Sequence, residues 1–417
     1  MLFSMFFGAG NLIFPAKLGV DAGSNFWPAI LGFLAAGVLL PVMGIIAIAL
    51  SGEDVGDLAQ RAGRVFGAAF PVLVYLSIGA FYALPRTGAV SFETAIVPLT
   101  GNHSTVSSAI FNLIFFGVTL ALAWNPNKII SALGEFLTPA LVVLLVLLIG
   151  LSLGKFHLAS STPTGDYVTS PAAHGLLQGY LTMDALAALA FGIVVISSLE
   201  SQNVKDVGKS TIIAGVSAGA ILAVIYVGLG TIGRVLPNAS SFSNGAGILS
   251  EAANQTMGDV GRLIWAAIVV LACLTTSVGL VSATSEFFAN LWGRYHTWAV
   301  VFTVASCAMA TAGLDTVLGI AAPIIGFIYP AGITLIVVAL LAPMIRWDLR
   351  WSWYLPIWTA TVWSALSSLA KPLVAWAPLQ GVSLGWVIPT ICALGIGLLI
   401  DAKRTTPDDQ PSAALAS

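Results

Sequence analysis

The sequence predicts an all-α integral membrane protein with about twelve transmembrane helices. Of its 417 residues, 58% are hydrophobic and only 8% are charged, whereas soluble proteins average about 25% charged residues. Apolar segments of about 20 residues, the length that spans a bilayer, recur along the chain. Two of these segments, the first and the sixth, are interrupted by glycines. A chain of this composition cannot cover a soluble surface, so we interpret it as one polytopic membrane domain over 1–401.

The predicted segments fall into two halves. The first ten divide into five plus five, with approximate repeats at 1–153 and 176–343, and 353–401 adds two C-terminal helices. The polar stretch 238–258 is interpreted as a loop, and 402–417 as a disordered tail. The expected spans are 1–20 (broken), 28–50, 68–97, 108–124, 131–153, 176–199 (broken), 210–233, 262–290, 297–313, 316–343, 353–371 and 383–401.

The distribution of Lys and Arg predicts the orientation, because short cytoplasmic loops carry an excess of both. With the N-terminus inside, ten of the sixteen cations lie on the inner side and five on the outer side, and one lies within a span. Both termini are therefore predicted to be cytoplasmic.

An interruption near the start of the chain divides the first segment. Gly8, Gly10 and Asn11 are followed by Pro15. Glycine weakens a helix and proline lacks an N–H, so we expect the helix to open between Gly8 and Pro15. In a membrane, the freed backbone groups must be buried in protein or bind something. Close packing by small residues is the alternative, but packing glycines do not need a side-chain amide beside them, which favours a working break.

The sixth segment carries a second interruption. The stretch GYLTMD at 179–184 is followed by Phe191 and Gly192, where we expect the break, and Asp184 lies within about two helical turns of it. Interrupted segments at corresponding positions of two halves indicate inverted repeats with a binding site at the bilayer midplane.

Three hydroxyl residues stand together in the eighth segment. Thr275, Thr276 and Ser277 offer the oxygen ligands that an alkali cation prefers, if the first segment passes close by. The alternative is that these hydroxyls bond carbonyls of their own helix, which is usual for membrane Ser and Thr.

Charged side chains within spans are costly and are functional candidates. Arg86 and Glu93 lie about two turns apart on one helix face, where a structural ion pair and a role in transport both remain open. Asp184 is the titratable group nearest the second break.

Other functional classes find little support. The four histidines fall in loops or near segment ends without metal-ligand spacing, and the three cysteines lie far apart. Nucleophile, nucleotide and metalloprotease motifs are absent from the sequence. The net charge of −2 gives no argument for a nucleic-acid partner. We therefore expect neither an enzyme nor a cofactor.

Three motifs carry a family resemblance over essentially the whole chain. They are FGAGNLIFP at 7–15, PRT at 85–87 leading to SFE at 91–93, and LTMDALAALAFG at 181–192. These motifs resemble the bacterial branched-chain amino acid:cation symporters, the BrnQ-type or LIVCS family. The resemblance implies import of leucine, isoleucine and valine with Na⁺ or H⁺, and a LeuT-like five-plus-five inverted-repeat fold.

Carried over position by position, the resemblance implies two sites. At the substrate site, the amides of Ala9 and Gly10 face the carboxylate, and Phe191 and Tyr82 wall the pocket. At the Na⁺ site, the carbonyls of Ser4 and Phe7 join Thr276 and Ser277. The candidate substrate-binding residues are Gly8, Ala9, Gly10, Asn11, Tyr82, Phe191 and Gly192, and the candidates for a proton or charge relay are Asp184, Arg86 and Glu93.

The chain departs from this family at its start, because family members have more residues before the glycines. Only about ten apolar residues precede the break, fewer than a spanning helix needs, which favours a truncated or late-assigned start. The expected location is the bacterial inner membrane, and the expected partners are the amino acid, the cation and lipid. A same-fold carrier of another small solute, a channel and an intramembrane enzyme are the alternatives.

Overall fold

The computed structural model describes residues 2–51, 55–125, 137–157, 162–242, 244–345 and 348–404, and every regular element in these ranges is helical. Within these ranges, seven helices are long and apolar enough to cross a membrane, or up to nine if each of two bent pairs is one span. The all-helical membrane class is thus confirmed, and the count of twelve stays a prediction. The α-helices are α1 (Leu2–Phe6), α2 (Ala9–Ala22), α3 (Phe26–Leu34), α4 (Leu40–Ser51), α5 (Val55–Gln60), α6 (Arg64–Leu76), α7 (Ala83–Ser91), α8 (Val97–Thr100), α9 (Thr105–Ala123), α11 (Thr138–Lys155), α12 (Pro171–Tyr180), α13 (Asp184–Ser201), α14 (Val207–Val235), α15 (Gly245–Met257), α16 (Asp259–Trp292), α17 (Tyr295–Thr311), α18 (Leu314–Leu341), α19 (Trp351–Leu369), α20 (Lys371–Val374) and α21 (Val387–Arg404).

Each expected span overlaps one or more of these helices, although Met1 and 131–136 lie outside the described residues. Helix α21 includes 402–404, so the predicted tail does not begin at 402, and its remainder, 405–417, lies outside the described residues. The stretch 238–258 was wrongly predicted to be a loop, because it contains α15. Asn244 caps this helix by accepting the N–H of Gly247 at 3.0 Å. Ile248, Leu249 and Ala252 are buried on one face, so this polar stretch forms an amphipathic helix.

Both predicted breaks exist, but at shifted positions. The first spans only Phe7 and Gly8, and Pro15 lies inside α2. The second falls at Leu181–Met183, between α12 and α13, so placing it at Phe191 and Gly192 was wrong. Gly192 instead packs on α4, since a Cβ there would lie 2.8 Å from the side chain of Ile48.

The third span contains an interruption that the sequence analysis missed. Tyr82 adopts φ −146° and ψ −71°, between a π-helical turn at Ser77–Phe81 and α7. The side chain that follows one turn later is Arg86.

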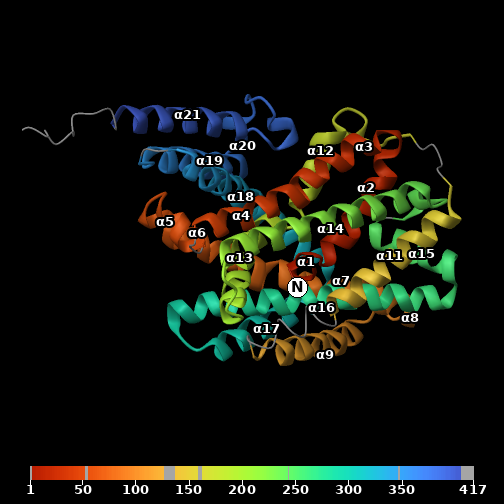
Figure 1. Cartoon of the computed structure of the whole chain (residues 1–417). Helices are drawn as coiled ribbons and strands as arrows, with labels where there is room; N and C mark the ends of the chain where they lie inside the picture. Colours follow the sequence, from red (N-terminus) through yellow and green to blue (C-terminus); the bar gives the residue numbers. More distant parts are fainter. Residues whose placement is uncertain are drawn as a thin grey trace, which may run out of the picture.

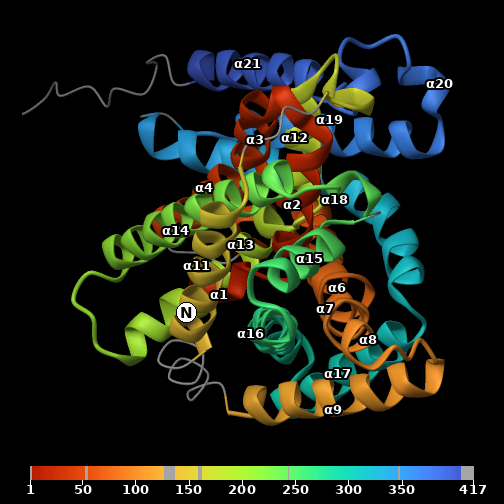
Figure 2. The ribbon, with the colours of Figure 1, turned by 90° about the vertical axis from the view of Figure 1, so that its right-hand side faces the viewer.

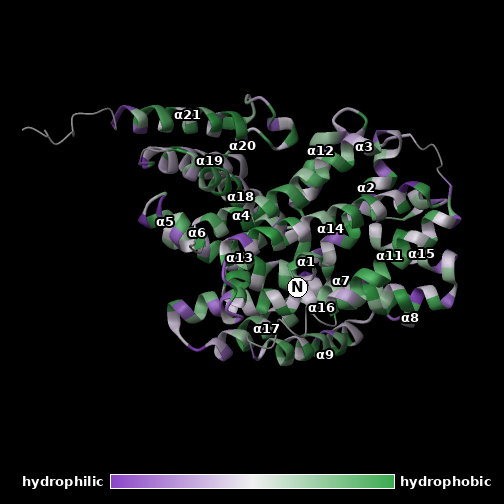
Figure 3. Ribbon diagram, viewed as in Figure 1, coloured by the Kyte–Doolittle hydropathy of each residue, from purple (hydrophilic) through white to green (hydrophobic). Residues whose placement is uncertain are grey.

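One half of each broken pair, α1 and α13, lies in the middle of the molecule. In Figures 1 and 2, α19, α20 and α21 lie along one edge, α9 and α17 lie along the opposite edge, and α1 and α13 lie between them. Helix α9 is largely hydrophobic (Figure 3), with Val106, Ile110 and Leu113 exposed on its outer face. An apolar outer face is what a lipid-facing helix requires.

Glycines bring one half of each broken helix, α2 and α12, into backbone contact with neighbours. A Cβ added to Gly19 of α2 would lie 1.9 Å from the carbonyl oxygen of Gly230 in α14, and one added to Gly233 would lie 1.9 Å from that of Ala16. Similarly, a Cβ on Gly32 of α3 would lie 2.0 Å from the carbonyl oxygen of Ala172 in α12. These crossings admit no side chain, so α2 and α12 are held tightly.

Gly233→Ala should therefore lower stability, because its methyl group would force α14 away from α2. Overpacking typically costs about 1–3 kcal/mol. Thermal unfolding of the purified protein should show a clear drop in the melting temperature. Gly117→Ala, at a position in α9 with open space around it, should leave the melting temperature unchanged or raise it. Equal effects of the two substitutions would contradict the tight crossing.

Candidate functional site

A small cavity lies where the helix breaks meet. Its volume is about 20 Å³, and α1, α2, α7, α13 and α16 all contribute to its walls. A space of that size holds about one water molecule, so the cavity is smaller than any amino acid. Among the predicted residues, those that line it are Gly8, Asn11, Arg86, Asp184, Phe191 and Thr276.

Asn11 ties the first break to the second. Its side-chain oxygen accepts the backbone N–H of Gly8 at 3.3 Å, and its Nδ2 donates to Asp184 Oδ2 at 2.5 Å. The hydroxyl of Tyr226, in α14, accepts a hydrogen bond from the same amide and donates to Asp184 Oδ2 at 3.2 Å. Asn11 was predicted to contact substrate, but in this structure its side chain is occupied by protein groups.

Arg86 satisfies the carbonyls of the second break. Its Nη1 donates to the oxygen of Leu181 at 2.8 Å, and its Nη2 donates to that of Thr182 at 3.1 Å. Nη1 also bonds the hydroxyl of Tyr82, over whose ring the guanidinium lies at 4.4 Å. The Nε of Arg86 is buried without a hydrogen-bond partner in the described structure.

Arg86 and Glu93 do not meet. Glu93 is exposed and accepts the N–H of Leu314, at the start of α18, at 3.4 Å. A π-helical turn, Phe92–Ile96, begins between the two positions and widens the helix there, while Arg86 is drawn to the opposite break. The suggested ion pair between Arg86 and Glu93 is therefore wrong.

The hydroxyl cluster divides between two neighbours. Thr275 and Thr276 donate to the backbone oxygen of Ser4 in α1, at 3.0 and 3.3 Å. Ser277 instead faces Thr119 of α9, at 2.9 Å. The structure thus brings Ser4 together with Thr276, as predicted, but not with Ser277, and Thr275 takes the place of Ser277. The sequence could not show which two of the three hydroxyls face α1, because consecutive side chains on a helix point about 100° apart.

Thr138 of α11 completes this cluster by donating to Ser4 Oγ at 2.8 Å. In the described ranges, no three His, Cys, Asp or Glu side chains group as metal ligands. A cation placed at the cluster would meet neutral hydroxyl and carbonyl oxygens.

The remaining predicted residues do not line the small cavity, and they pack around the residues that do. Phe7 stacks on Phe3, with ring centroids 5.3 Å apart. Tyr82 holds Arg86, and Tyr82 is not among the residues that line the small cavity. Gly10 lies against Arg86, since a Cβ there would be 3.0 Å from Arg86 Nη2. Ala9 contributes the first backbone amide of α2.

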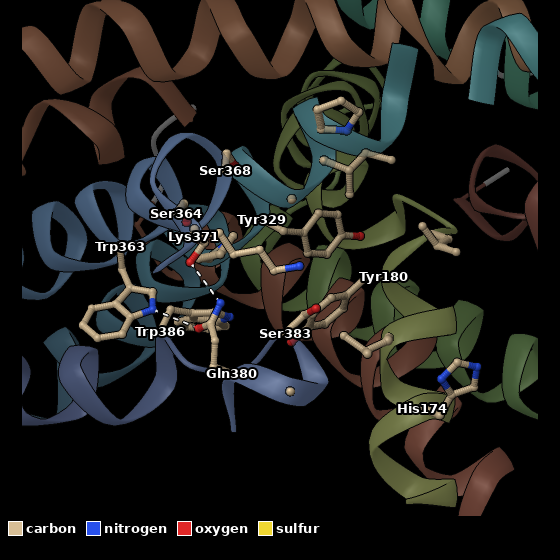
Figure 4. A pocket seen from close by; sticks show the side chains of 18 of the residues that line it. His174, Tyr180, Tyr329, Trp363, Ser364, Ser368, Lys371, Gln380, Ser383 and Trp386 are labelled. Atoms are coloured by element: carbon tan, nitrogen blue, oxygen red, sulfur yellow. Dashed lines mark hydrogen bonds between the residues drawn. The ribbon is translucent and has the colours of Figure 1, made fainter. Parts of the chain in front are cut away.

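A second, larger cavity of about 740 Å³ lies beside α12, α18 and α19 (Figure 4). Tyr180, Tyr329 and Lys371 line it. It borders Leu181, whereas the next residue, Thr182, lines the small cavity. The break after α12 is therefore part of the wall between the two cavities. The larger cavity was not predicted from the sequence, because its lining comes from separate helices and a C-terminal loop.

Solved structures of transporters share this fold. The nucleobase-cation-symport-1 family transporter Mhp1, in a closed conformation with bromovinylhydantoin bound, matches with a TM-score of 0.60 and 16% identity, covering 97% of this chain and 91% of Mhp1. A manganese transporter of Eremococcus coleocola matches with a TM-score of 0.52 and 13% identity, covering 96% and 94%. At these identities the likeness establishes the fold alone.

Sequence relatives establish the family. The branched-chain amino acid permease BrnQ of Corynebacterium glutamicum is 54% identical over 408 residues, covering 97% of this chain and 94% of the relative. The permease BraB of Bacillus subtilis is 39% identical, covering 96% and 94%. The family model for branched-chain amino acid transport proteins matches residues 1–404. The chain therefore belongs to the branched-chain amino acid transport protein family, whose members are membrane transporters and not enzymes.

Proposed function

We propose that this protein imports leucine, isoleucine and valine by symport with Na⁺, through alternating access across a bacterial inner membrane. The observation that carries the proposal is the small cavity at the helix breaks, which joins charged groups to an apolar wall. Family membership supports the substrate class. Both termini are proposed to be cytoplasmic, and no cofactor takes part.

The substrate site is proposed to be the small cavity in an expanded state. A branched-chain amino acid does not fit into about 20 Å³, so helices must move apart to admit it. The larger cavity is proposed to supply the approach, because it borders Leu181, whose neighbour Thr182 lines the small cavity. Opening would have to displace that wall, which Arg86 holds by two hydrogen bonds.

The repeat architecture is proposed to be five plus five, within twelve membrane helices. Support comes from the broken pairs α1 with α2 and α12 with α13, which occupy corresponding places in the two halves. Helices α19 and α21 correspond to the additional C-terminal pair.

The cation site is proposed at Ser4, Thr275 and Thr276. Their oxygens already converge within hydrogen-bond distance, and neutral oxygens suit an alkali cation. Proton coupling through Asp184 is the competing proposal, because this carboxylate is buried in the small cavity.

Uptake of labelled leucine into proteoliposomes tests the proposal. An inward Na⁺ gradient should drive accumulation, and a pH gradient alone should not. Isoleucine and valine should compete with leucine, since an apolar pocket distinguishes one methylene by only about 1–3 kcal/mol. Alanine should compete weakly, and lysine or glutamate hardly at all. Competition by lysine as strong as that by isoleucine would refute the substrate assignment.

Gly10→Val should reduce leucine uptake by at least about tenfold while expression persists, because its branches would displace Arg86 and overpacking costs about 1–3 kcal/mol. Uptake normalised to purified protein checks this expectation. Gly117→Val, in open space on α9, is the matched control. Normal transport by well-expressed Gly10→Val would contradict the proposal that the substrate carboxylate binds at the first break.

Thr276→Ala should raise the Na⁺ concentration for half-maximal leucine uptake by about fivefold to tenfold, the equivalent of one lost polar contact. Thr275→Ala should act in the same direction. Ser277→Ala, whose hydroxyl faces Thr119, should have a smaller effect and serves as the control. If Ser277→Ala had the larger effect, the site would have to be redrawn around α9.

A further inference from the structure

We propose that Asp184 and Arg86 are the two poles that recognise the backbone of the transported amino acid. Asp184 would bind the ammonium group, and Arg86 would bind the carboxylate together with the first amides of α2. This inference rests on the proposed function, because it presupposes a zwitterionic substrate in the small cavity.

Two opposite charges, Asp184 and Arg86, face one cavity without forming an ion pair. Asp184 is 3% exposed and Arg86 is 5% exposed, and both line the cavity. Within the described ranges, neither takes part in an ion pair within 4.0 Å. Buried charges are costly unless a partner compensates them. A ligand that carries both a positive and a negative group would compensate the two at once.

The pole that would bind the substrate carboxylate lies at Gly10, beside Arg86. Arg86 Nη2 lies 3.0 Å from the point where a Cβ on Gly10 would be. Gly10 is the second residue of α2, a helix of 14 residues, so its N–H has no partner within the helix. Arg86 Nε is a buried donor without a partner in the described structure. Guanidinium and helix amides thus lie side by side, and both favour a carboxylate.

The pole that would bind the substrate ammonium group lies at Asp184. Its Oδ2 accepts hydrogen bonds from Asn11 and Tyr226, which are neutral donors. These bonds fix the carboxylate but bring no positive charge into contact with it, and Arg86 attracts it across the cavity without forming an ion pair. Phe191 and Met5 line the same cavity and provide apolar surface for a side chain. The ammonium, the carboxylate and the side chain would therefore each meet a suitable group.

The poles explain why a carrier with an apolar pocket would reject simple amines and acids of the same shape. An amine without a carboxylate would leave Arg86 without a bound anion, and an acid without an ammonium would leave Asp184 without a bound cation. Removing one partner of a buried, hydrogen-bonded charge pair weakens binding by at least about 30-fold.

The test uses three probes that share the isobutyl side chain: leucine, 3-methylbutylamine, which lacks the carboxylate, and 4-methylpentanoate, which lacks the ammonium. Their binding to the purified full-length protein in Na⁺ is measured by displacement of labelled leucine, or directly for variants. Wild type should bind leucine at least about 30-fold more tightly than either analogue. In Asp184→Asn, leucine should lose that advantage over 4-methylpentanoate. In Arg86→Gln, leucine should lose its advantage over 3-methylbutylamine.

Matched substitutions control for the general effect of losing a charge. Asp401→Asn removes a buried carboxylate that bonds Ser352 between α19 and α21, and Arg234→Gln removes a guanidinium that lies over Phe26. Both should keep the wild-type preference for leucine. Asp184→Glu and Arg86→Lys retain the charges and should keep more of that preference than the neutral variants.

Three results would overturn the inference. The first is displacement of leucine from wild type by either analogue as effectively as by leucine itself. The second is an unchanged preference in folded Asp184→Asn or Arg86→Gln. The third is loss of preference in the charge-retaining variants equal to that in the neutral ones. Failure of wild type to bind leucine at all would instead refute the proposed function.

Discussion

Backbone that is opened inside a membrane must find polar partners, and this constraint organises the centre of the molecule. The carbonyls of Leu181 and Thr182 are satisfied by Arg86, from a helix that is itself interrupted at Tyr82. The N–H of Gly8 is satisfied by Asn11, which also reaches Asp184. The freed backbone groups of each break are thus hydrogen-bonded by a side chain from an interrupted segment. The interrupted segments therefore form one connected polar unit surrounded by apolar helices.

The two halves of the first segment are held by different neighbours. Helix α2 crosses α14 through Gly19 and Gly233, where no Cβ fits. Helix α1 is bound to α16 by hydroxyls of Thr275 and Thr276 on the oxygen of Ser4. Backbone-close packing has no low-cost alternative arrangement, whereas hydrogen bonds can be exchanged for other ligands. If the two halves hinge at Phe7 and Gly8, α1 should therefore move more easily than α2.

The sequence predicted features that depend on composition and local chemistry. Span length and apolarity located the helices, and Gly8 with Asn11 identified a break. The sequence did not reveal which glycines open a helix: Gly192 serves packing against Ile48, and the second break uses Met183, a non-glycine residue with φ 70°. That choice depends on which helix lies opposite, which is tertiary information.

The proposed cation and substrate sites are joined by a short stretch of chain. Ser4 lies in α1, and Gly8 begins the turn into α2, so both sites share the segment that connects them. Thr276 contacts both ends: it donates to the oxygen of Ser4, and its Oγ1 lies 2.9 Å from the point where a Cβ on Gly8 would be. A cation that drew Thr276 toward itself would shift the wall of the substrate cavity. Because coupling between two binding equilibria is reciprocal, a substrate that fixed the same wall would strengthen cation binding by an equal factor.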